Sequence, residues 1–102
     1  MCQIFAGQDP ADYDSETRSM RINGLSTSIR LETSFWRVLD DIATREGLTV
    51  AQFVCKLHDE VIEHYGEARN FTSLLRCACL IHVRRDRSES RPDNQPESRP
   101  AA

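Results

Sequence analysis

Ser26, Ser28 and Arg30 form an alternating polar series that could bind another molecule through hydrogen bonds. In an extended strand the three side chains share one face, because successive strand residues point to opposite sides. An arginine can donate two parallel hydrogen bonds, and a serine hydroxyl can donate or accept one. The simpler interpretation is that Arg30 only keeps the edge of a sheet soluble, as charged edge residues commonly do. The elements that follow the strand favour the binding role.

A short strand at residues 26–31 positions this series, and two amphipathic helices follow it. The other face of the strand carries Thr27, Ile29 and Leu31, so one side of it is largely apolar. A strand with an unpaired edge and two helices with open apolar stripes cannot bury themselves as a monomer. We therefore expect a homodimer whose strands pair antiparallel. The residues expected in the dimer core are Ile29, Leu31, Phe35, Leu39, Ile42, Phe53, Val54 and Leu57.

Both helices have start and stop signals. Thr33 or Ser34 can cap the first helix, and Gly47 ends it. The second helix opens with a capping-box pattern over residues 49–52 and ends at Gly66. These signals predict two helices separated by a tight turn.

The chain from Ser26 to Gly66 resembles a known family in four segments, STSIRL, TSFWRVLDDIA, GLT and AQFVCKLHDEVIEHY. The family is that of the ribbon-helix-helix DNA-binding proteins, which includes the Arc and methionine repressors. A closer resemblance, RSMRINGLSTSIRLETSFW followed by NFTSLLR, covers Arg18 to Arg84 and is to an uncharacterised bacterial branch. The implied fold is mainly α with one short β-strand. It is an intertwined homodimer with a two-stranded antiparallel ribbon, to which this chain adds a third C-terminal helix.

The resemblance gives the alternating polar series a role. In the family, alternate residues on the outward face of the paired strands touch base edges in the major groove. By position, these are Ser26, Ser28 and Arg30. Arginine suits the role because it can bind guanine O6 and N7 together.

Phosphate contacts are expected from two other parts of the chain. The resemblance implies them for the first turn of the second helix, through the Thr49 hydroxyl and the amides of Val50 and Ala51. Free amides and the helix dipole favour an anion there, although an ordinary capped helix start explains the same pattern. Arg18 and Arg21 are the other candidates, because they lie close before the strand in a stretch without acidic residues.

Charge is unevenly distributed along the chain. The formal net charge is −3, which taken alone argues against nucleic acid. Residues 1–16, however, carry four acidic and no basic side chains, whereas residues 17–85 carry ten basic and eight acidic ones. The expected folded part is therefore mildly basic, with most of its acids on the helices and away from the strand.

We expect a domain at residues 18–85, between an N-terminal arm at residues 1–17 and a disordered tail at residues 86–102. The third helix follows a break after Gly66, with Asn70 or Thr72 as its cap. Its buried side is expected to include Phe71, Leu74, Leu75, Ala78 and Ile81.

Three smaller features complete the expected fold. Asn23-Gly24 is a strong hairpin signal, so residues 20–22 can fold back on residues 25–27. Ile4 and Phe5 are the apolar part of the arm, and we expect them to tuck against the domain. Trp36 is expected to pack against the arm or the third helix.

Cysteine and histidine residues do not form a convincing metal site. Cys77, Cys79 and His82 could hold zinc, but the two cysteines have no CxxC spacing and face different sides of a helix. We expect a set of small buried thiols instead, and no metal, cofactor or catalytic constellation.

These observations predict a cytoplasmic, membrane-independent protein that is not an enzyme. The leading hypothesis is a homodimeric transcriptional regulator, acting as a repressor on double-stranded DNA. One alternative is an antitoxin that uses the same fold, although its tail has few apolar residues with which to hold a toxin. Another is a protein-interaction or scaffold module that has lost DNA binding, which the weak net basicity favours.

Overall fold

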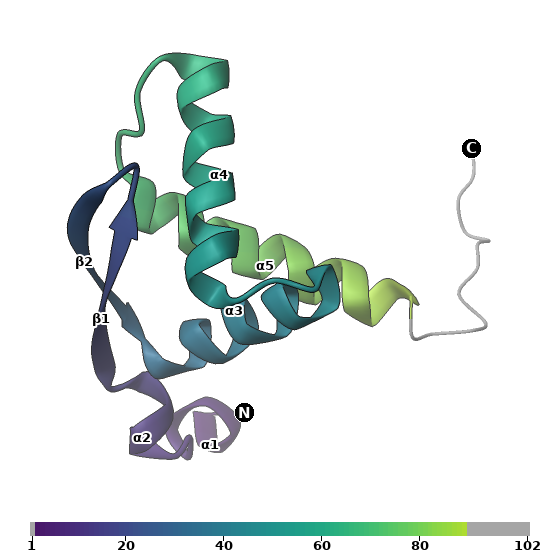
Figure 1. Ribbon diagram of the computed structural model, residues 1–102. Coiled ribbons are helices and arrows are strands. Elements are labelled where there is room, and N and C mark those ends of the chain that lie inside the picture. The colour runs from purple at the N-terminus through teal and green to yellow at the C-terminus, as the bar shows by residue number, and fades with distance from the viewer. Residues whose placement is uncertain (1, 90–102) are drawn as a thin grey trace.

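The computed structural model describes residues 2–89, with side chains described for residues 4–86. The chain is mainly helical, with a two-stranded antiparallel sheet followed by three helices (Figure 1). The elements are α1 (Cys2–Ala6), α2 (Pro10–Tyr13), β1 (Ser15–Ile22), β2 (Leu25–Glu32), α3 (Thr33–Glu46), α4 (Val50–Tyr65) and α5 (Phe71–Glu89). Within this part of the chain, no helix is long and apolar enough to cross a membrane.

The hairpin of β1 and β2 closes through a two-residue turn at Asn23 and Gly24. Both residues have positive φ, 54° and 80°, as the tight turns that join twisted strands require. The pairing runs from Ile22 opposite Leu25 to Ser15 opposite Glu32. The predicted hairpin is therefore confirmed and is longer than expected, so the strand predicted at residues 26–31 pairs with a strand of its own chain.

The inner face of the hairpin packs on the helices and forms the core. Alternation drives this packing, because Met20, Ile22, Ile29 and Leu31 all point to the same side of the sheet. The buried apolar residues are Ile22, Ile29, Leu31, Trp36, Leu39, Ala43, Val54, Val61, Leu75 and Cys79. Strand β1 and helix α5 thus provide part of the core that the sequence assigned to a second subunit.

Trp36 is the largest fully buried side chain. Its Nε1 donates a hydrogen bond of 2.8 Å to the carbonyl oxygen of Glu16, within the expected arm, and the Arg18 guanidinium lies 4.5 Å above its ring. Phe35, its neighbour, faces α5, where the Arg76 guanidinium lies 5.9 Å from the centre of its ring. Trp36 therefore packs α3 against β1.

Most of the expected helix ends are confirmed. Gly47 and Gly66 adopt left-handed conformations after α3 and α4, and Thr49 and Gln52 form the predicted capping box. The predicted cap of α3 is wrong, because its N-cap residue is Glu32 and this residue makes no side-chain capping bond. The hydroxyls of Thr33 and Ser34 instead donate to carbonyl oxygens of the preceding segment.

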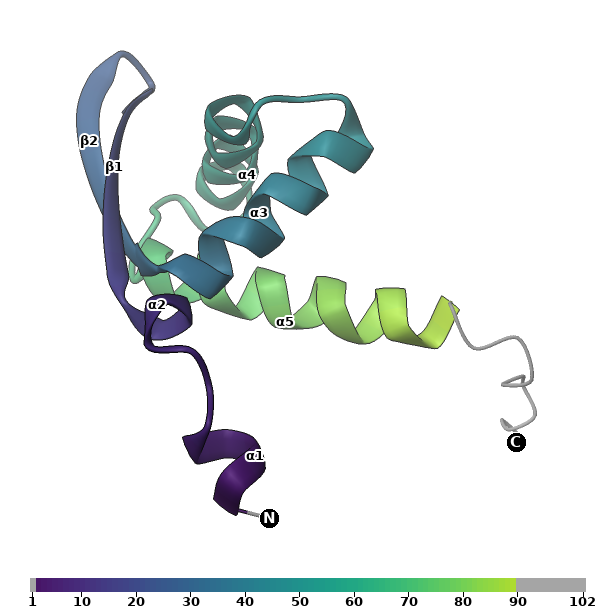
Figure 2. The ribbon, with the colours of Figure 1, turned by 90° about the horizontal axis from the view of Figure 1, so that it is seen from below.

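The N-terminal segment is held by polar contacts rather than by its apolar residues. Arg37 pairs with Asp12 at 2.6 Å, and the Ser34 hydroxyl donates to the Asp12 carbonyl at 2.7 Å. Ile4 and Phe5 are 75% and 64% exposed, and α1 stands apart from helices α3–α5 (Figure 2). The expectation that they tuck against the domain is wrong, since the acidic segment anchors α2 and leaves α1 beyond it.

Helix α5 presents most of the expected side to the core, because Phe71 packs against it and Leu74 and Ala78 are partly buried. Leu75 and Cys79 are buried, whereas Ile81 is 46% exposed, so the prediction for Ile81 is wrong. Two ion pairs flank the buried side of the helix, where Arg76 binds Glu32 at 3.0 Å and His82 binds Asp41 at 2.8 Å. Helix α5 continues to Glu89, and residues 90–102 of the predicted tail lie outside the described residues.

The Arg76–Glu32 ion pair predicts a pH dependence of stability. The Arg76 guanidinium holds the pKa of the Glu32 carboxyl below its usual range. A depressed folded-state pKa stabilises the protein above the usual glutamate pKa of about 4.3, and this contribution is lost as the pH falls through the folded-state value. We expect Glu32→Gln to reduce the acid-side loss of stability in urea denaturation between pH 3 and 6. An unchanged pH profile would contradict this assignment.

Candidate nucleic-acid interface

The outer face of the hairpin is a continuous polar surface. Residues that pair across the strands lie on the same side of the sheet, so β1 and β2 each contribute alternate residues to this face. All six central residues of the face are exposed, and none is acidic: Thr17, Ser19, Arg21, Ser26, Ser28 and Arg30. The alternation that turns apolar residues inward thus leaves hydroxyl and guanidinium groups pointing to solvent.

The three residues predicted to contact DNA bases lie together on β2. Ser26, Ser28 and Arg30 are exposed on the outer face, at successive alternate positions. Among the described residues, the Arg30 side chain has no ion pair or hydrogen bond, so its guanidinium is available to a ligand. These three residues form a small hydrogen-bonding surface without enclosed volume, which suits a flat or grooved partner rather than a small molecule.

Strand β1 adds residues to this face that the sequence reasoning missed. Ser19 lies opposite Ser28, with 3.3 Å between their hydroxyl oxygens, and Thr17 lies opposite Arg30. The signal was present in the sequence, because SETRSMRI alternates in polarity as the following strand does. The expected hairpin includes only residues 20–22 of this segment, so it leaves out Thr17 and Ser19.

The predicted phosphate contacts Arg18 and Arg21 have different surroundings. Arg21 is on the outer face beside the turn, where its Nη1 donates to the Gly24 carbonyl at 2.8 Å. Arg18 is on the inner face, where it pairs with Glu16 at 2.9 Å and Asp40 at 3.6 Å and stacks on Trp36. This environment favours a structural role for Arg18.

The first turn of α4 lies close to Arg21. Arg21, Ala51, Gln52 and Cys55 border one surface hollow, and the Cys55 thiol donates to the Arg21 carbonyl at 2.8 Å. In the capping box, the backbone N–H of Gln52 donates to the Thr49 hydroxyl. The side-chain oxygen of Gln52 accepts from the backbone N–H of Thr49. The amides of Val50 and Ala51 have no partner among the backbone bonds outside helices, as expected for the first turn of a helix.

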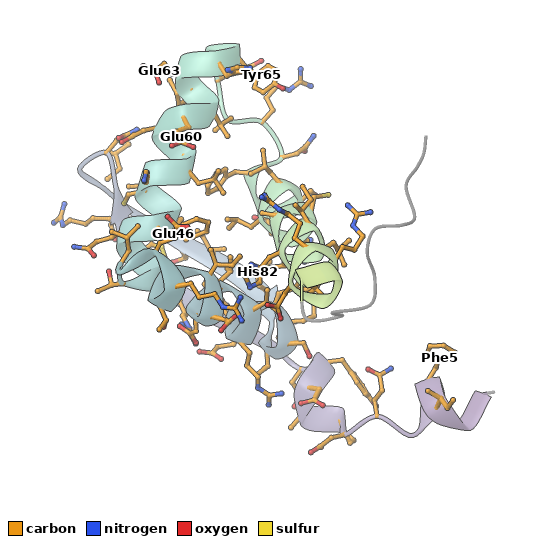
Figure 3. All side chains as sticks on the ribbon, turned by 90° about the vertical axis from the view of Figure 1, so that its right-hand side faces the viewer. Phe5, Glu46, Glu60, Glu63, Tyr65 and His82 are labelled. Atoms are coloured by element: carbon orange, nitrogen blue, oxygen red, sulfur yellow. The ribbon has the colours of Figure 1, made fainter. Side chains whose placement is uncertain are left out.

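Acidic side chains limit this positive region to the start of α4. Asp59, Glu60 and Glu63 line the far part of the same hollow, and Figure 3 shows Glu60 and Glu63 along α4 toward Tyr65. An anion at the first turn gains from the helix dipole, whereas one beside the middle of α4 meets repulsion. A polyanion would therefore lie along the hairpin and the first turn only.

The residues predicted for the dimer core divide into two groups. Ile29, Leu31, Leu39 and Val54 are buried within the subunit itself. Phe35, Ile42, Phe53 and Leu57 are only partly buried and pack at the margin of the core. The second group is the part of the prediction that leaves apolar surface for another molecule.

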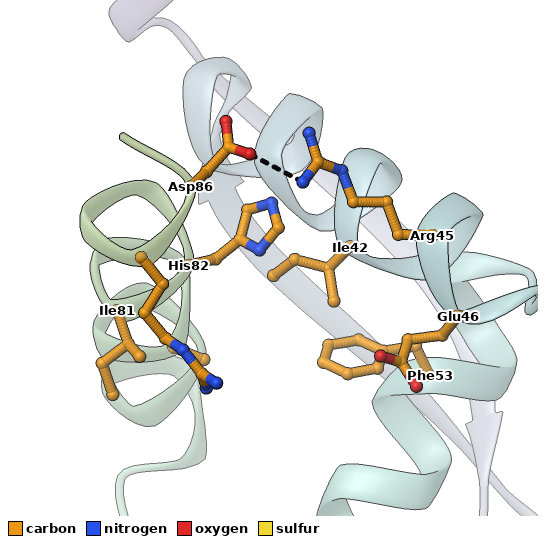
Figure 4. Close-up of a pocket in the computed structure, with 9 residues that line it drawn as sticks. Ile42, Arg45, Glu46, Phe53, Ile81, His82 and Asp86 are labelled. Carbon is orange, nitrogen blue, oxygen red and sulfur yellow. Dashed lines mark hydrogen bonds and ion pairs between the residues drawn. The ribbon is translucent and has the colours of Figure 1, made fainter. Parts of the chain in front are cut away.

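A second hollow lies between α3, α4 and α5 (Figure 4). It has a volume of about 320 Å³, with Ile42, Phe53 and Ile81 on its apolar side, and the Arg45–Asp86 pair at 2.7 Å crosses its rim. Arg45 is engaged by Asp86, and His82 is held by Asp41. The lining presents no nucleophile paired with a base, so this hollow does not have the arrangement of a catalytic site.

The cysteines and His82 do not converge. Cys77 is exposed, so the expectation that the thiols are buried is wrong for this residue. Cys79 is buried, and burial raises the pKa of its thiol to about 11. A thiol with a raised pKa is a poor metal ligand, because the thiolate is the form that binds. In the described residues, no group of three or more His, Cys, Asp or Glu side chains is placed to hold a metal ion.

The hairpin followed by α3 and α4 defines a ribbon-helix-helix architecture, and comparison with known proteins agrees. Residues 15–83 match the model of the ribbon-helix-helix domain family, to which the chain therefore belongs. This is a DNA-binding fold, and the proteins of the family are typically not enzymes.

A solved structure is similar to this chain over most of its length. It is that of an uncharacterized protein from Bordetella pertussis Tohama I, with 46% sequence identity and a TM-score of 0.79. The match covers 81% of this chain and 66% of the Bordetella chain, just under two thirds of its length. No curated protein matches the chain.

Proposed function

We propose that the protein is a sequence-specific transcriptional regulator of the cytoplasm that binds double-stranded DNA through the outer face of its hairpin. The observation that carries the proposal is the exposed polar face, whose six central residues include no acid, with no hydrogen bond or ion pair of the Arg30 side chain within the described chain. The fold belongs to a DNA-binding family, and the face has the hydrogen-bonding groups that read base edges. As a repressor, it would act by occupying promoter DNA.

Base contacts and phosphate contacts contribute to DNA binding in different ways. Arg30 donates two hydrogen bonds to a guanine, and Ser26 and Ser28 donate to or accept from neighbouring bases. Phosphates are held by the first turn of α4, through the Thr49 hydroxyl and the amides of Val50 and Ala51, and Arg21 beside this turn adds positive charge. Phosphate contacts fix the position of the protein on the duplex, and base contacts give sequence preference.

We infer that the working form is a homodimer, the usual state in the family. The partly buried Phe35, Ile42, Phe53 and Leu57 provide apolar surface for a second subunit. Two subunits related by a two-fold axis bind an inverted repeat, because operator symmetry mirrors protein symmetry. The cooperative use of two half-sites raises affinity without new types of contact.

A protein-interaction module is the second candidate, as a scaffold or as an antitoxin. It is favoured by exposed apolar side chains on α5, where Leu80, Ile81 and Val83 are 55%, 46% and 48% exposed. Exposed apolar residues that lie close together commonly mark a protein-binding surface. In this case the hairpin face would be a solvated surface without a nucleic-acid ligand.

Salt dependence of DNA binding separates the two functions. The experiment is fluorescence anisotropy of the purified protein on labelled DNA from upstream of its own gene, with scrambled duplex as competitor, at salt concentrations from about 50 to about 200 mM. A groove-binding regulator prefers its own upstream DNA, and the logarithm of its affinity falls linearly and steeply with the logarithm of the salt concentration. Weak binding that does not distinguish the two DNAs would favour the interaction module.

A further inference from the structure

We propose that the hairpin of a single subunit is a complete DNA-reading ribbon, in which Thr17, Ser19 and Arg21 of β1 contact bases alongside the residues of β2. This inference rests on the proposed DNA binding. Beyond that function, it assigns both strands of the ribbon to one chain and predicts the geometry of the half-site.

The outer faces of the two strands are near copies of each other. On β1 the outward residues are Thr17, Ser19 and Arg21, and on β2 they are Ser26, Ser28 and Arg30. The strands are antiparallel with Ser19 opposite Ser28, so a local two-fold axis through this serine pair relates Arg21 to Arg30 and Thr17 to Ser26. Two subunits that paired β2 with β2 would present the same chemistry, and here one chain supplies it alone.

The width of the major groove favours this arrangement. The groove is about 12 Å wide and admits a two-stranded ribbon. If a second copy added its hairpin at the free edge of β2, the sheet would have four strands. The axes of the outer strands would then be about 14 Å apart before any side chains are counted. A sheet of that width does not enter the groove, whereas one hairpin does.

The other edge of the hairpin is already covered within the chain. The carbonyl of Arg21, at the outer edge of β1, accepts the hydrogen bond from the Cys55 thiol of α4 at 2.8 Å. Nearby, the amide nitrogen of the Asn23 side chain lies 3.4 Å from His58 Nδ1. Helix α4 therefore covers the edge of β1 at its turn end, where another strand would have to join.

The register sets the spacing between the two reading arginines. Arg21 lies level with Ser26 and Arg30 lies level with Thr17, so four residue steps separate the arginines along the ribbon. This corresponds to about 14 Å along the strands and to about four base pairs of duplex. Each half-site should therefore contain two G·C pairs about four base pairs apart. Their guanines should lie on opposite DNA strands, with the serine pair over the bases between them.

Arg21 is prepared for this role by the turn. One of its terminal nitrogens, Nη1, is fixed on the Gly24 carbonyl at 2.8 Å, which limits the conformations of the side chain. The guanidinium still carries further N–H groups that can donate to a guanine. A preordered side chain loses less entropy on binding than a free one.

The test begins by selecting the preferred site of the wild-type protein from a randomised duplex library. Binding of wild type, Arg21→Ala and Arg30→Ala is then measured on this site and on versions with 7-deazaguanine, which lacks the N7 acceptor, at either guanine. Each variant should lose roughly 5- to 150-fold in preference over scrambled DNA. Each variant should also become insensitive to 7-deaza substitution at one of the two guanines. The guanine concerned should be different for Arg21→Ala and for Arg30→Ala. Arg69→Ala, which removes an exposed arginine of the loop after α4, should change neither property.

Two results would overturn the inference. If Arg21→Ala weakened binding to selected and scrambled DNA equally, while only Arg30→Ala lost preference, β1 would contact phosphate and β2 alone would read bases. The proposed function would stand in that case. If the library yielded no preferred site, the inference and the sequence-specific function would fail together.

Discussion

Replacing Trp36 by alanine is expected to lower the free energy of unfolding by about 3–5 kcal/mol, the usual cost of removing a large buried aromatic side chain. The Trp36 side chain is 0% exposed, and no other residue fills its position between α3 and β1. The variant also loses the hydrogen bond from Nε1 to the Glu16 carbonyl and the stacking of Arg18. Urea denaturation followed by circular dichroism measures this change, since Trp36 is the chain's one tryptophan and fluorescence would lose its probe.

Phe5→Ala is the matched control for this substitution. It also removes an aromatic ring, but Phe5 is 64% exposed on α1, so its loss should change stability by no more than about 0.5 kcal/mol. Similar effects of the two substitutions, or a cost for Trp36→Ala below the roughly 1 kcal/mol of an average substitution, would contradict the role of Trp36 in holding the hairpin on α3.

Replacing Arg30 by alanine is expected to remove about 1–3 kcal/mol of the preference for specific over scrambled DNA. The folded protein itself should be almost unaffected, because Arg30 is exposed and has no ion pair among the described residues. Arg30→Lys keeps the positive charge but cannot donate the bidentate pair to guanine. We therefore expect the lysine variant to keep the salt dependence of the wild type while losing most of the sequence preference.

Anisotropy titrations on the two DNAs, with thermal unfolding of each variant as a check, separate these effects. Arg69→Ala serves as the control, since Arg69 is an exposed arginine away from the hairpin, and its preference should match that of the wild type. If Arg30→Ala kept the full preference, Arg30 would have no part in base recognition.

Much of the framework follows from local signals in the sequence. The capping box at Thr49, the left-handed glycines after α3 and α4 and the Asn23-Gly24 turn are short-range features that neighbouring residues determine. The outward direction of Ser26, Ser28 and Arg30 follows from strand alternation alone. These features could be predicted because they need no knowledge of what packs against them.

The parts that could not be predicted depend on choices between chemically similar partners. Trp36 and Phe35 are adjacent aromatic residues, and only tertiary packing decides which one faces β1 and which faces α5. The pairs of Arg76 with Glu32 and of His82 with Asp41, which flank the buried side of α5, likewise join residues 44 and 41 positions apart in the sequence. Such long-range ion pairs leave no periodic signal in the sequence.

The full length of β1 could not be predicted, because the family pattern pairs β2 with a strand of a second subunit. The segment SETRSMRI has the alternation of a strand, and its inner residue Ile22 is buried in the core. A family pattern in which the second strand comes from another subunit gave no reason to extend the hairpin beyond Met20. Strand β1 fills one edge of β2 along its full length, and the other edge of β2 has no partner strand in the described part of the chain.

Amide chemical-shift mapping tests the central claim most directly, that the outer face of the hairpin binds double-stranded DNA. Uniformly ¹⁵N-labelled protein is titrated with its selected duplex at a salt concentration where binding is specific. The largest changes should fall in residues 17–30 and at the first turn of α4, with little change along the C-terminal half of α5. Changes confined to α5, with the hairpin amides unmoved at saturation, would contradict the account.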